Sequence, residues 1–281
     1  MKKIKLWILP AVVILCVILF AAYCIWDKLA RDESAPVISV EEGTLSLSVR
    51  DGQETLLRGV TAWDEQDGDV TDLMVVEGIS SIDKNHCATV TYAAFDRAGH
   101  VSKSKRTICY TDYESPRFVL SSALMFRSGY GVDIYDYITV SDLIDGDLSS
   151  QIKANLVEGE YDLSKVGTHL VELRVTNSMG DTVRLTVPVW VYSPSDYNAD
   201  LSLTDYLVYL EKGQPFDAET YLNFLYAGGQ MISKRALTEN GAVIDIESNV
   251  QPDVPGTYRV IYTVAWQSYT AGSQLIVVVE E

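Results

Sequence analysis

The sequence predicts an all-β protein in which three similar β-sandwich domains follow one N-terminal transmembrane helix. Three observations predict it: an apolar run near the start, a motif that recurs, and short alternating strands separated by turns. The motif of residues 61–73 returns at residues 139–152, so that Asp67-Gly68-Asp69 corresponds to Asp145-Gly146-Asp147. A period of about 80 residues is too long for a solenoid repeat and fits a small domain used in tandem.

The first element is the apolar run of residues 6–26, which lies between charged residues: Lys2, Lys3 and Lys5 before it, Asp27 and Lys28 after it. At about 1.5 Å per residue, a helix of this length spans roughly 31 Å, which is close to the thickness of the bilayer's hydrocarbon core. Basic residues in front of a span favour an N-terminus inside the cell. We therefore expect residues 1–33 to be a cytoplasmic stub and a signal-anchor helix in the plasma membrane. The rest of this single-pass chain is then extracellular.

Two alternatives to the anchor stay open. A cleaved secretory signal has a shorter apolar stretch and a small-x-small exit site, whereas Phe20-Ala21-Ala22-Tyr23 fits such a site poorly. A lipoprotein would use Cys24, but the bulky Tyr23 stands where a small residue is expected. The uncleaved anchor is the favoured interpretation.

The part beyond the helix is strongly acidic. Residues 34–281 contain 17 Lys and Arg against 36 Asp and Glu, a net charge of −19. Such a surface repels nucleic acid and anionic membranes and keeps a displayed protein soluble. The composition therefore indicates no nucleic-acid partner.

The three domains are expected at residues 34–112, 113–193 and 194–281. The first two open on a proline followed by an apolar strand, at Pro36 and Pro116, as expected where a proline begins an edge strand. In the third domain, Ala227-Gly228-Gly229-Gln230 stands where the Asp-Gly-Asp loop is expected, so this copy has diverged.

Strands of period 2 follow each motif. In the second domain Val171, Leu173 and Val175 face one way, and Val183, Leu185 and Val187 answer them across the turn at residues 178–180. In the first domain Val90, Tyr92 and Ala94 take the corresponding positions. Several short alternating strands with turns between them are typical of a β-sandwich.

These features together resemble the bacterial surface immunoglobulin-like domains, which occur in tandem on exported bacterial proteins. The resemblance rests on the D-x-x-D-G-D loops at residues 64–69 and 142–147, the D-x-A-G turn at 96–99 and the V-G-T turn at 166–168. In the third domain only residues 254–258 and the strand after them match well. The resemblance implies immunoglobulin-like sandwiches on a cell surface, without enzymatic activity.

Two cysteines are the sharpest local signal. If Arg97-Ala98-Gly99 is the hairpin loop, the numbers of opposed residues sum to 196, which places Cys87 opposite Cys109. Opposed Cβ atoms lie about 4.5–5.5 Å apart, slightly wide for a disulfide unless the local twist brings them together. An extracellular compartment permits oxidation. We expect a disulfide on the outer face of the sheet, the alternative being two reduced thiols.

The acidic loops have two interpretations. The carboxylates of each copy, which are Asp64, Asp67 and Asp69 in the first and Asp142, Asp145 and Asp147 in the second, could gather a calcium ion. Alternatively, Asp caps its own backbone and Gly supplies a positive φ in a tight turn. The turn is the favoured interpretation, and no metal or cofactor is predicted.

Catalysis finds little support. The three histidines lie far apart in sequence, and no nucleophile elbow, phosphate loop or C-x-x-C motif is present. We expect a non-catalytic structural or adhesive module with an unknown extracellular protein or glycan as partner. The alternative is a glycan- or cell-wall-binding protein. Four aromatic residues near the boundary between the second and third domains bear on that alternative: Trp190, Tyr192, Tyr206 and Tyr209. Packing between the domains is the favoured interpretation of them.

Overall fold

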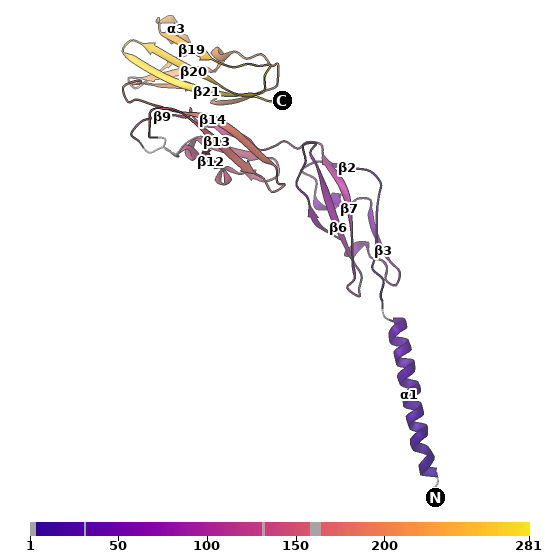
Figure 1. Cartoon of the computed structure of the whole chain (residues 1–281). Coiled ribbons are helices and arrows are strands. Elements are labelled where there is room, and N and C mark those ends of the chain that lie inside the picture. The colour runs from indigo at the N-terminus through magenta and orange to yellow at the C-terminus, as the bar shows by residue number, and fades with distance from the viewer. Residues whose placement is uncertain (1–3, 31, 131–132, 158–163) are drawn as a thin grey trace. The chain divides into compact units, whose positions relative to one another are not determined.

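The computed structural model describes residues 4–30, 32–130, 133–157 and 164–281. It contains one long helix and three β-sandwich domains, as predicted (Figure 1). The chain forms two compact units with their boundary between residues 111 and 112, so the second and third domains belong to one unit. Lys2 and Lys3 lie outside the described residues.

Helix α1 (Ile4–Ala30) carries the apolar run. Its segment Pro10–Lys28 has a mean hydropathy of 2.2 and is long and apolar enough to cross a membrane. From Pro10 to Trp26 every residue is exposed. A helix that is apolar all round is typically buried or membrane-spanning, and the described residues do not bury this segment.

The three domains repeat one arrangement of seven strands. The strands of the first domain are β1 (Val37–Val40), β2 (Leu45–Leu47), β3 (Val60–Asp64), β4 (Gly68–Asp69), β5 (Val75–Ile79), β6 (Cys87–Phe95) and β7 (Val101–Tyr110). Those of the second are β8 (Arg117–Leu120), β9 (Met125–Arg127), β10 (Ile138–Asp142), β11 (Gly146–Asp147), β12 (Lys153–Leu156), β13 (Gly167–Thr176) and β14 (Thr182–Tyr192). Those of the third are β15 (Asp200–Leu203), β16 (Leu207–Leu210), β17 (Leu222–Ala227), β18 (Gln230–Ser233), β19 (Val243–Ser248), β20 (Gly256–Trp266) and β21 (Tyr269–Val279).

Short helices connect some of the strands. They are α2 (Gln53–Leu56) and η1 (Thr71–Leu73) in the first domain, η2 (Ile134–Tyr137) and η3 (Ser149–Gln151) in the second, and η4 (Ala218–Tyr221) and α3 (Lys234–Glu239) in the third.

Each domain consists of a three-stranded and a four-stranded sheet. The orders β1-β3-β4, β8-β10-β11 and β15-β17-β18 correspond, and so do β2-β7-β6-β5, β9-β14-β13-β12 and β16-β21-β20-β19. In each four-stranded sheet the first two strands of this order run parallel and the others antiparallel. The third domain therefore keeps the full plan, although a two-residue Gly228-Gly229 turn between Ala227 and Gln230 replaces its acidic loop.

The predicted alternation builds the cores. Val171 pairs with Val187 and Leu173 with Leu185, and all four side chains are buried. The same holds in the first domain, where Tyr92 is fully buried and donates a hydrogen bond from its hydroxyl to the carbonyl of Leu56 at 2.8 Å. A period of two on these strands is therefore enough to separate the core from the surface.

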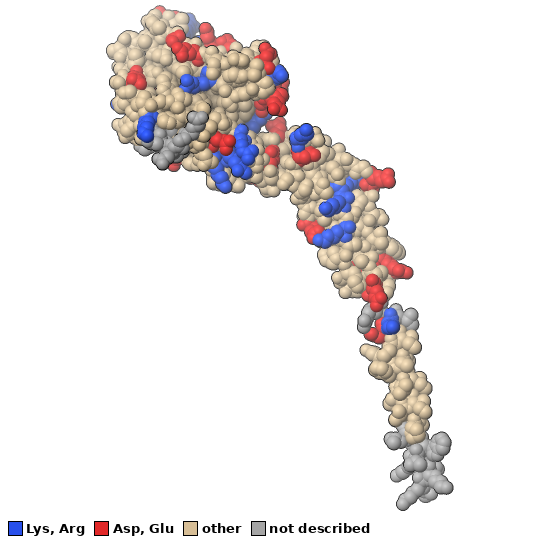
Figure 2. Space-filling model, in the orientation of Figure 1, with Lys and Arg blue, Asp and Glu red and all other residues tan. Residues whose placement is uncertain are grey.

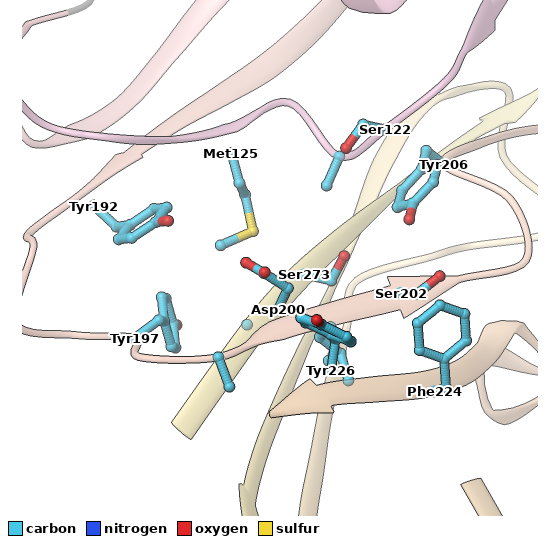
Figure 3. A pocket seen from close by; sticks show the side chains of 14 residues that line it. Ser122, Met125, Tyr192, Tyr197, Asp200, Ser202, Tyr206, Phe224, Tyr226 and Ser273 are labelled. Carbon is cyan, nitrogen blue, oxygen red and sulfur yellow. The ribbon is translucent and has the colours of Figure 1, made fainter. Parts of the chain in front are cut away.

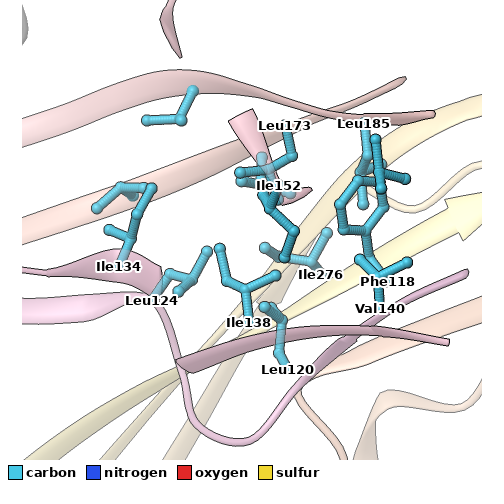
Figure 4. Packing of buried hydrophobic residues seen from close by; sticks show 14 of the residues in the cluster. Phe118, Leu120, Leu124, Ile134, Ile138, Val140, Ile152, Leu173, Leu185 and Ile276 are labelled. Carbon is cyan, nitrogen blue, oxygen red and sulfur yellow. The ribbon is translucent and has the colours of Figure 1, made fainter. Parts of the chain in front are cut away.

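The second and third domains share part of a core. Strand β21 presents Leu275 and Val277 to the core of its own domain. Its opposite face presents Ile276, which is fully buried among the core residues of the second domain (Figure 4). Beside it, the fully buried Gln274 donates from its amide nitrogen to the carbonyls of Leu124 at 2.7 Å and Pro188 at 2.9 Å. We call this contact the interdomain joint.

Tyr209 of β16 adds a polar contact to the interdomain joint. Its hydroxyl accepts from the backbone nitrogen of Phe118 at 3.2 Å and donates to the carbonyl of Phe118 at 3.3 Å. The guanidinium of Arg117 lies 5.0 Å from the ring centroid and pairs with Glu280 at 3.1 Å. Burial raises the pKa of Tyr209 to about 12, against the opposing effects of the Phe118 backbone and the Arg117 charge.

We predict that Ile276→Ala destabilises the second and third domains together. Removing a buried Ile side chain costs about 2–5 kcal/mol through lost burial and the cavity left behind. Urea unfolding of the full chain in lipid nanodiscs measures the change. The matched control is Val243→Ala, since Val243 is 67% exposed, and it should change the free energy of unfolding by no more than about 0.5 kcal/mol. An equal effect of both substitutions would contradict the role of Ile276.

We predict that Tyr209 makes this unit sensitive to alkali. The ordinary pKa of 10.0 applies to the unfolded chain and about 12 to the folded one. The contribution of Tyr209 is therefore complete below pH 10 and is lost as the pH rises toward 12. Two pKa units correspond to about 3 kcal/mol. The free energy of unfolding should thus fall less steeply between pH 10 and 12 in Tyr209→Phe than in the unaltered chain, and identical slopes would contradict the assignment.

Candidate functional site

The acidic loops of the first two domains are built as tight turns. In the first, Asp64 Oδ1 accepts from the backbone nitrogens of Gln66 at 2.8 Å and Asp67 at 2.9 Å. In the second, Asp142 Oδ1 accepts in the same way from residues 144 and 145. Gly68 and Gly146 have φ of +77° and +74°, a conformation that favours glycine. These bonds agree with the turn interpretation of both loops.

The same bonds affect the carboxylates electrostatically. The backbone N–H of Asp67, together with that of Gln66, holds the pKa of Asp64 below its ordinary value although burial opposes this. The side chains of Thr71 and Ser149 lower the pKa of Asp69 and Asp147, respectively. Asp64, Asp69 and Asp147 are thus stabilised in their charged form by groups of their own turn.

Carboxylates also gather around Asp32, which the sequence analysis does not single out. Its ligand atoms lie within 4.8 Å of those of Asp64 and Asp67, and likewise of those of Asp96 and His100. Neither group includes Asp69, and no corresponding group occurs at the second loop within the described residues. Close acidic groups are expected in a chain of this charge, so calcium binding by the loops stays a hypothesis.

The histidines lie in or next to turns. His100 Nδ1 lies 2.6 Å from Asp96 Oδ2, and this hydrogen bond raises the pKa of His100. Burial alone would raise the pKa of Asp96, but its hydrogen bonds with His100 and Gly99 lower it. His169 Nε2 lies 2.8 Å from the carbonyl oxygen of Lys165, and His86 occupies a turn at φ +60°.

Cys87 and Cys109 lie opposite each other on β6 and β7, in the register expected from the hairpin arithmetic. Their sulfur atoms are joined in a disulfide across 22 residues. The neighbouring pair Ala88 and Ile108 points into the core, so the disulfide lies on the outer face of the sheet. Cys16 and Cys24 are free thiols on α1.

A hollow of about 360 Å³ lies beside the interdomain joint (Figure 3). We call it the interdomain hollow. The second domain contributes Ser122, Met125 and Tyr192, and the third contributes residues of β15, β17 and β21. Both domains belong to one compact unit. This volume lies at the lower end of the range of about 300–1,000 Å³ that is typical of small-molecule sites.

Strand alternation places the third domain's side chains in the hollow. On β15 and β17 the pair Leu201 and Leu225 is buried in the domain core. The flanking pairs are Asp200 with Tyr226 and Ser202 with Phe224. They lie on the opposite face of the sheet, because successive residues of a strand point to opposite sides, and all four line the hollow.

Tyr197 lies at the other side of the hollow, against Gly272 of β21. A Cβ on Gly272 would stand 2.5 Å from the Tyr197 ring, so the ring fits there only because residue 272 has no side chain. Asn198, the next residue, fixes this position because its backbone nitrogen and side-chain oxygen bond the backbone of Thr270. Close approach of this kind is a common use of glycine.

Aromatic residues of the second domain pack against Tyr197. The Tyr197 ring lies edge-on to Tyr192 at 5.2 Å and to Trp190 at 6.1 Å between centroids. The guanidinium carbon of Arg259 lies 6.0 Å from the centroid of the Trp190 ring. Burial raises the pKa of Tyr192, and the charge of Asp200 adds to this effect. The expected packing between domains is therefore confirmed for Trp190, while Tyr192 and Tyr206 also line the hollow.

Ser273 stands out among the polar groups of the hollow. The residue is 1% exposed, and its hydroxyl has no hydrogen-bond partner among the described residues. Figure 3 shows Ser273 among the side chains that line the hollow. Buried hydroxyls in proteins are almost always bonded, and Ser102 and Ser273 carry the two serine hydroxyls that lack a partner among the described residues. The sequence of one domain does not say which residues of another domain lie beside Ser273.

No protein-family model matches this chain. A curated relative, the pesticidal crystal protein Cry22Aa of Bacillus thuringiensis, is 33% identical over 129 residues. The match covers 45% of this chain and 16% of that protein, so the chain spans a small part of the relative's length.

Similar solved structures include the CBM51-2 domain in complex with GlcNAc and INT domains of Clostridium perfringens ZmpB, with 16% identity over 87% of this chain and 41% of that chain at a TM-score of 0.23. Human CDH23 EC21-23 is 14% identical over 87% of this chain and 100% of that one, at 0.22. The protocadherin gammaB7 EC3-6 cis-dimer structure is 12% identical over 88% and 74%, at 0.21. TM-scores this low carry nothing about function.

We predict that the disulfide stabilises the first domain. A covalent link across 22 residues removes unfolded-state entropy worth about 3 kcal/mol. The double substitution of Cys87 and Cys109 by Ser should lower the free energy of opening of the β6–β7 hairpin by about this amount, measured by hydrogen exchange on the full chain in nanodiscs. Substituting Cys16 and Cys24 by Ser is the control. Unchanged mass of the unaltered chain on reduction would contradict the disulfide itself.

Proposed function

We propose that this protein is a single-pass surface protein that holds three immunoglobulin-like domains outside the plasma membrane and works by contact rather than catalysis. Helix α1 is the anchor in this proposal, and its length and apolar surface support that role. The charged residues before it favour a cytoplasmic N-terminus. Residues 34–281 are then the displayed part.

The interdomain joint is the observation that carries the contact role. Ile276 and Gln274 are fully buried in it, and residues 112–281 belong to one compact unit. Interfaces between domains are commonly mobile unless they are large and apolar. A protein that recognises a partner by shape loses less entropy on binding when its surface is already rigid, and in this proposal the joint supplies that rigidity.

The chemistry of the described side chains supports a non-catalytic role. The recurring carboxylates cap backbone nitrogens, and His100 and His169 accompany turns. General acid–base catalysis requires such groups to face a substrate. Figure 2 shows Asp and Glu side chains scattered among Lys and Arg on the face in view. With the net charge of −17, this surface suits neither nucleic acid nor anionic lipid as a partner.

A second candidate, glycan binding, is favoured by one specific observation. The interdomain hollow combines aromatic rings, a carboxylate and a buried hydroxyl that has no partner among the described residues. Aromatic rings beside hydrogen-bonding groups suit the apolar C–H faces and the hydroxyls of a sugar.

We predict that the C-terminal region reacts with a membrane-impermeant thiol reagent on intact cells. The test uses Gln251→Cys, at an exposed position of the third domain, in a chain whose Cys16 and Cys24 are replaced by Ala. Labelling should occur without lysis, because the proposal places residue 251 outside.

The matched control is Lys3→Cys in the same background, which should be labelled only after lysis. The reverse pattern would contradict the proposed orientation. A mature chain that lacks residues 1–22 and is recovered from the medium would replace the anchor by a cleaved signal. A lipid-sized mass increase at Cys24, measured on the unaltered chain, would identify a lipoprotein.

A further inference from the structure

We propose that the interdomain hollow binds a short carbohydrate of one or two sugar units. This inference deepens the proposed function and rests on it, since it names the partner class of a surface protein. The volume of the hollow, about 360 Å³, lies at the lower end of the range of small-molecule sites, so it suits a ligand of one or two sugar units.

Aromatic rings occupy two sides of the hollow. Tyr226 is 46% exposed and stands beside Phe224 on β17, while Tyr192 and Tyr197 lie across from them (Figure 3). A sugar ring has faces of C–H bonds that are apolar, and its hydroxyls lie at the rim. Tyrosine offers an apolar ring face with a polar tip, so a sugar can stack on these rings while its hydroxyls stay near polar groups.

The polar groups define what the ligand must offer. Asp200 carries a carboxylate, which only accepts hydrogen bonds when charged. Ser273 carries a hydroxyl that is 1% exposed and has no partner among the described residues. The ligand must therefore donate to Asp200 and also bond a neutral hydroxyl in the same hollow. A sugar hydroxyl both donates and accepts, so a ligand with several hydroxyls suits both residues.

Two other ligand classes fit less well. A proline-rich peptide also favours aromatic grooves, but its backbone presents mostly carbonyl acceptors, which Asp200 repels. A quaternary ammonium group is attracted to aromatic rings and to a carboxylate, yet it has no hydrogen bond to give to Ser273. The combination of Asp200 and Ser273 thus favours a polyhydroxylated ligand.

The test begins with the full chain in lipid nanodiscs, prepared in a detergent without a sugar headgroup. A printed glycan array with mono-, di- and oligosaccharides and peptidoglycan fragments is the probe. The mono- or disaccharide that binds best is then titrated by calorimetry against variants of the hollow. The unaltered chain should bind at least one such sugar, and absence of binding to every glycan on the array would overturn the proposal.

Three variants locate the site. Tyr226→Ala should weaken binding about tenfold or more, as expected for an aromatic contact. Asp200→Asn should weaken it about tenfold, because bonds to a charged acceptor are the stronger kind. Ser273→Ala should weaken it about 3- to 10-fold, the range for a neutral hydrogen bond, while thermal stability stays unchanged or rises. A merely structural Ser273 would change stability without changing affinity.

Matched controls lie outside the hollow. Ser102→Ala removes the other serine hydroxyl that is buried without a partner within the described residues, and Asp205→Asn changes an exposed carboxylate nearby. Both should leave affinity unchanged. Equal affinity in all variants would place glycan binding elsewhere and overturn the assignment. The assignment is also overturned if no sugar binds but a proline-rich peptide or choline does, and its affinity falls in Tyr226→Ala.

Failure of this proposal and failure of the proposed function are separable. Binding is measured on purified protein and does not depend on membrane orientation. Thiol labelling on cells measures orientation and does not depend on the hollow.

Discussion

Two side chains of β21, Gln274 and Ile276, project from the third domain and are buried against the second domain. Ile276 contributes apolar burial, while the side-chain amide of Gln274 donates to the carbonyls of Leu124 and Pro188. Opening the joint would expose Ile276 and break both hydrogen bonds, each worth about 1 kcal/mol net, so this contact resists partial opening. The compactness of residues 112–281 depends on it.

The interdomain hollow is a consequence of this joint. Gly272 and Ser273 line the hollow on the same strand that carries the joint residues, and Tyr197 is held on Gly272 by its edge contacts with Tyr192 and Trp190. Opening the joint would separate the rings of the two domains. A ligand that touches both domains therefore also stabilises the joint, by the linkage that couples any binding to the state that binds.

Rules that act within one hairpin or turn predict much of this structure. The register that pairs Cys87 with Cys109 follows from the loop length, and the Asp-Gly-Asp turns follow from side-chain caps and positive φ. The hollow follows from neither, since it depends on which faces of two domains meet. One signal was nevertheless present. The sequence GSQLIVVV at the end of β21 lacks the alternation of a half-exposed strand, which indicates burial on both faces.

One feature of the acidic turns sets how freely the neighbouring sequence can vary. The Asp67 carboxylate accepts from the backbone nitrogen of Arg97 at 2.7 Å, and Asp145 accepts from that of Ser178 at 2.6 Å. Each bond joins a loop of one sheet to the hairpin tip of the other. Because the donor is main chain, any residue except proline can supply it. In the first two sandwiches this end is thus closed by a main-chain bond to one aspartate, as the unlike tips Arg97-Ala98-Gly99 and Ser178-Met179-Gly180 illustrate.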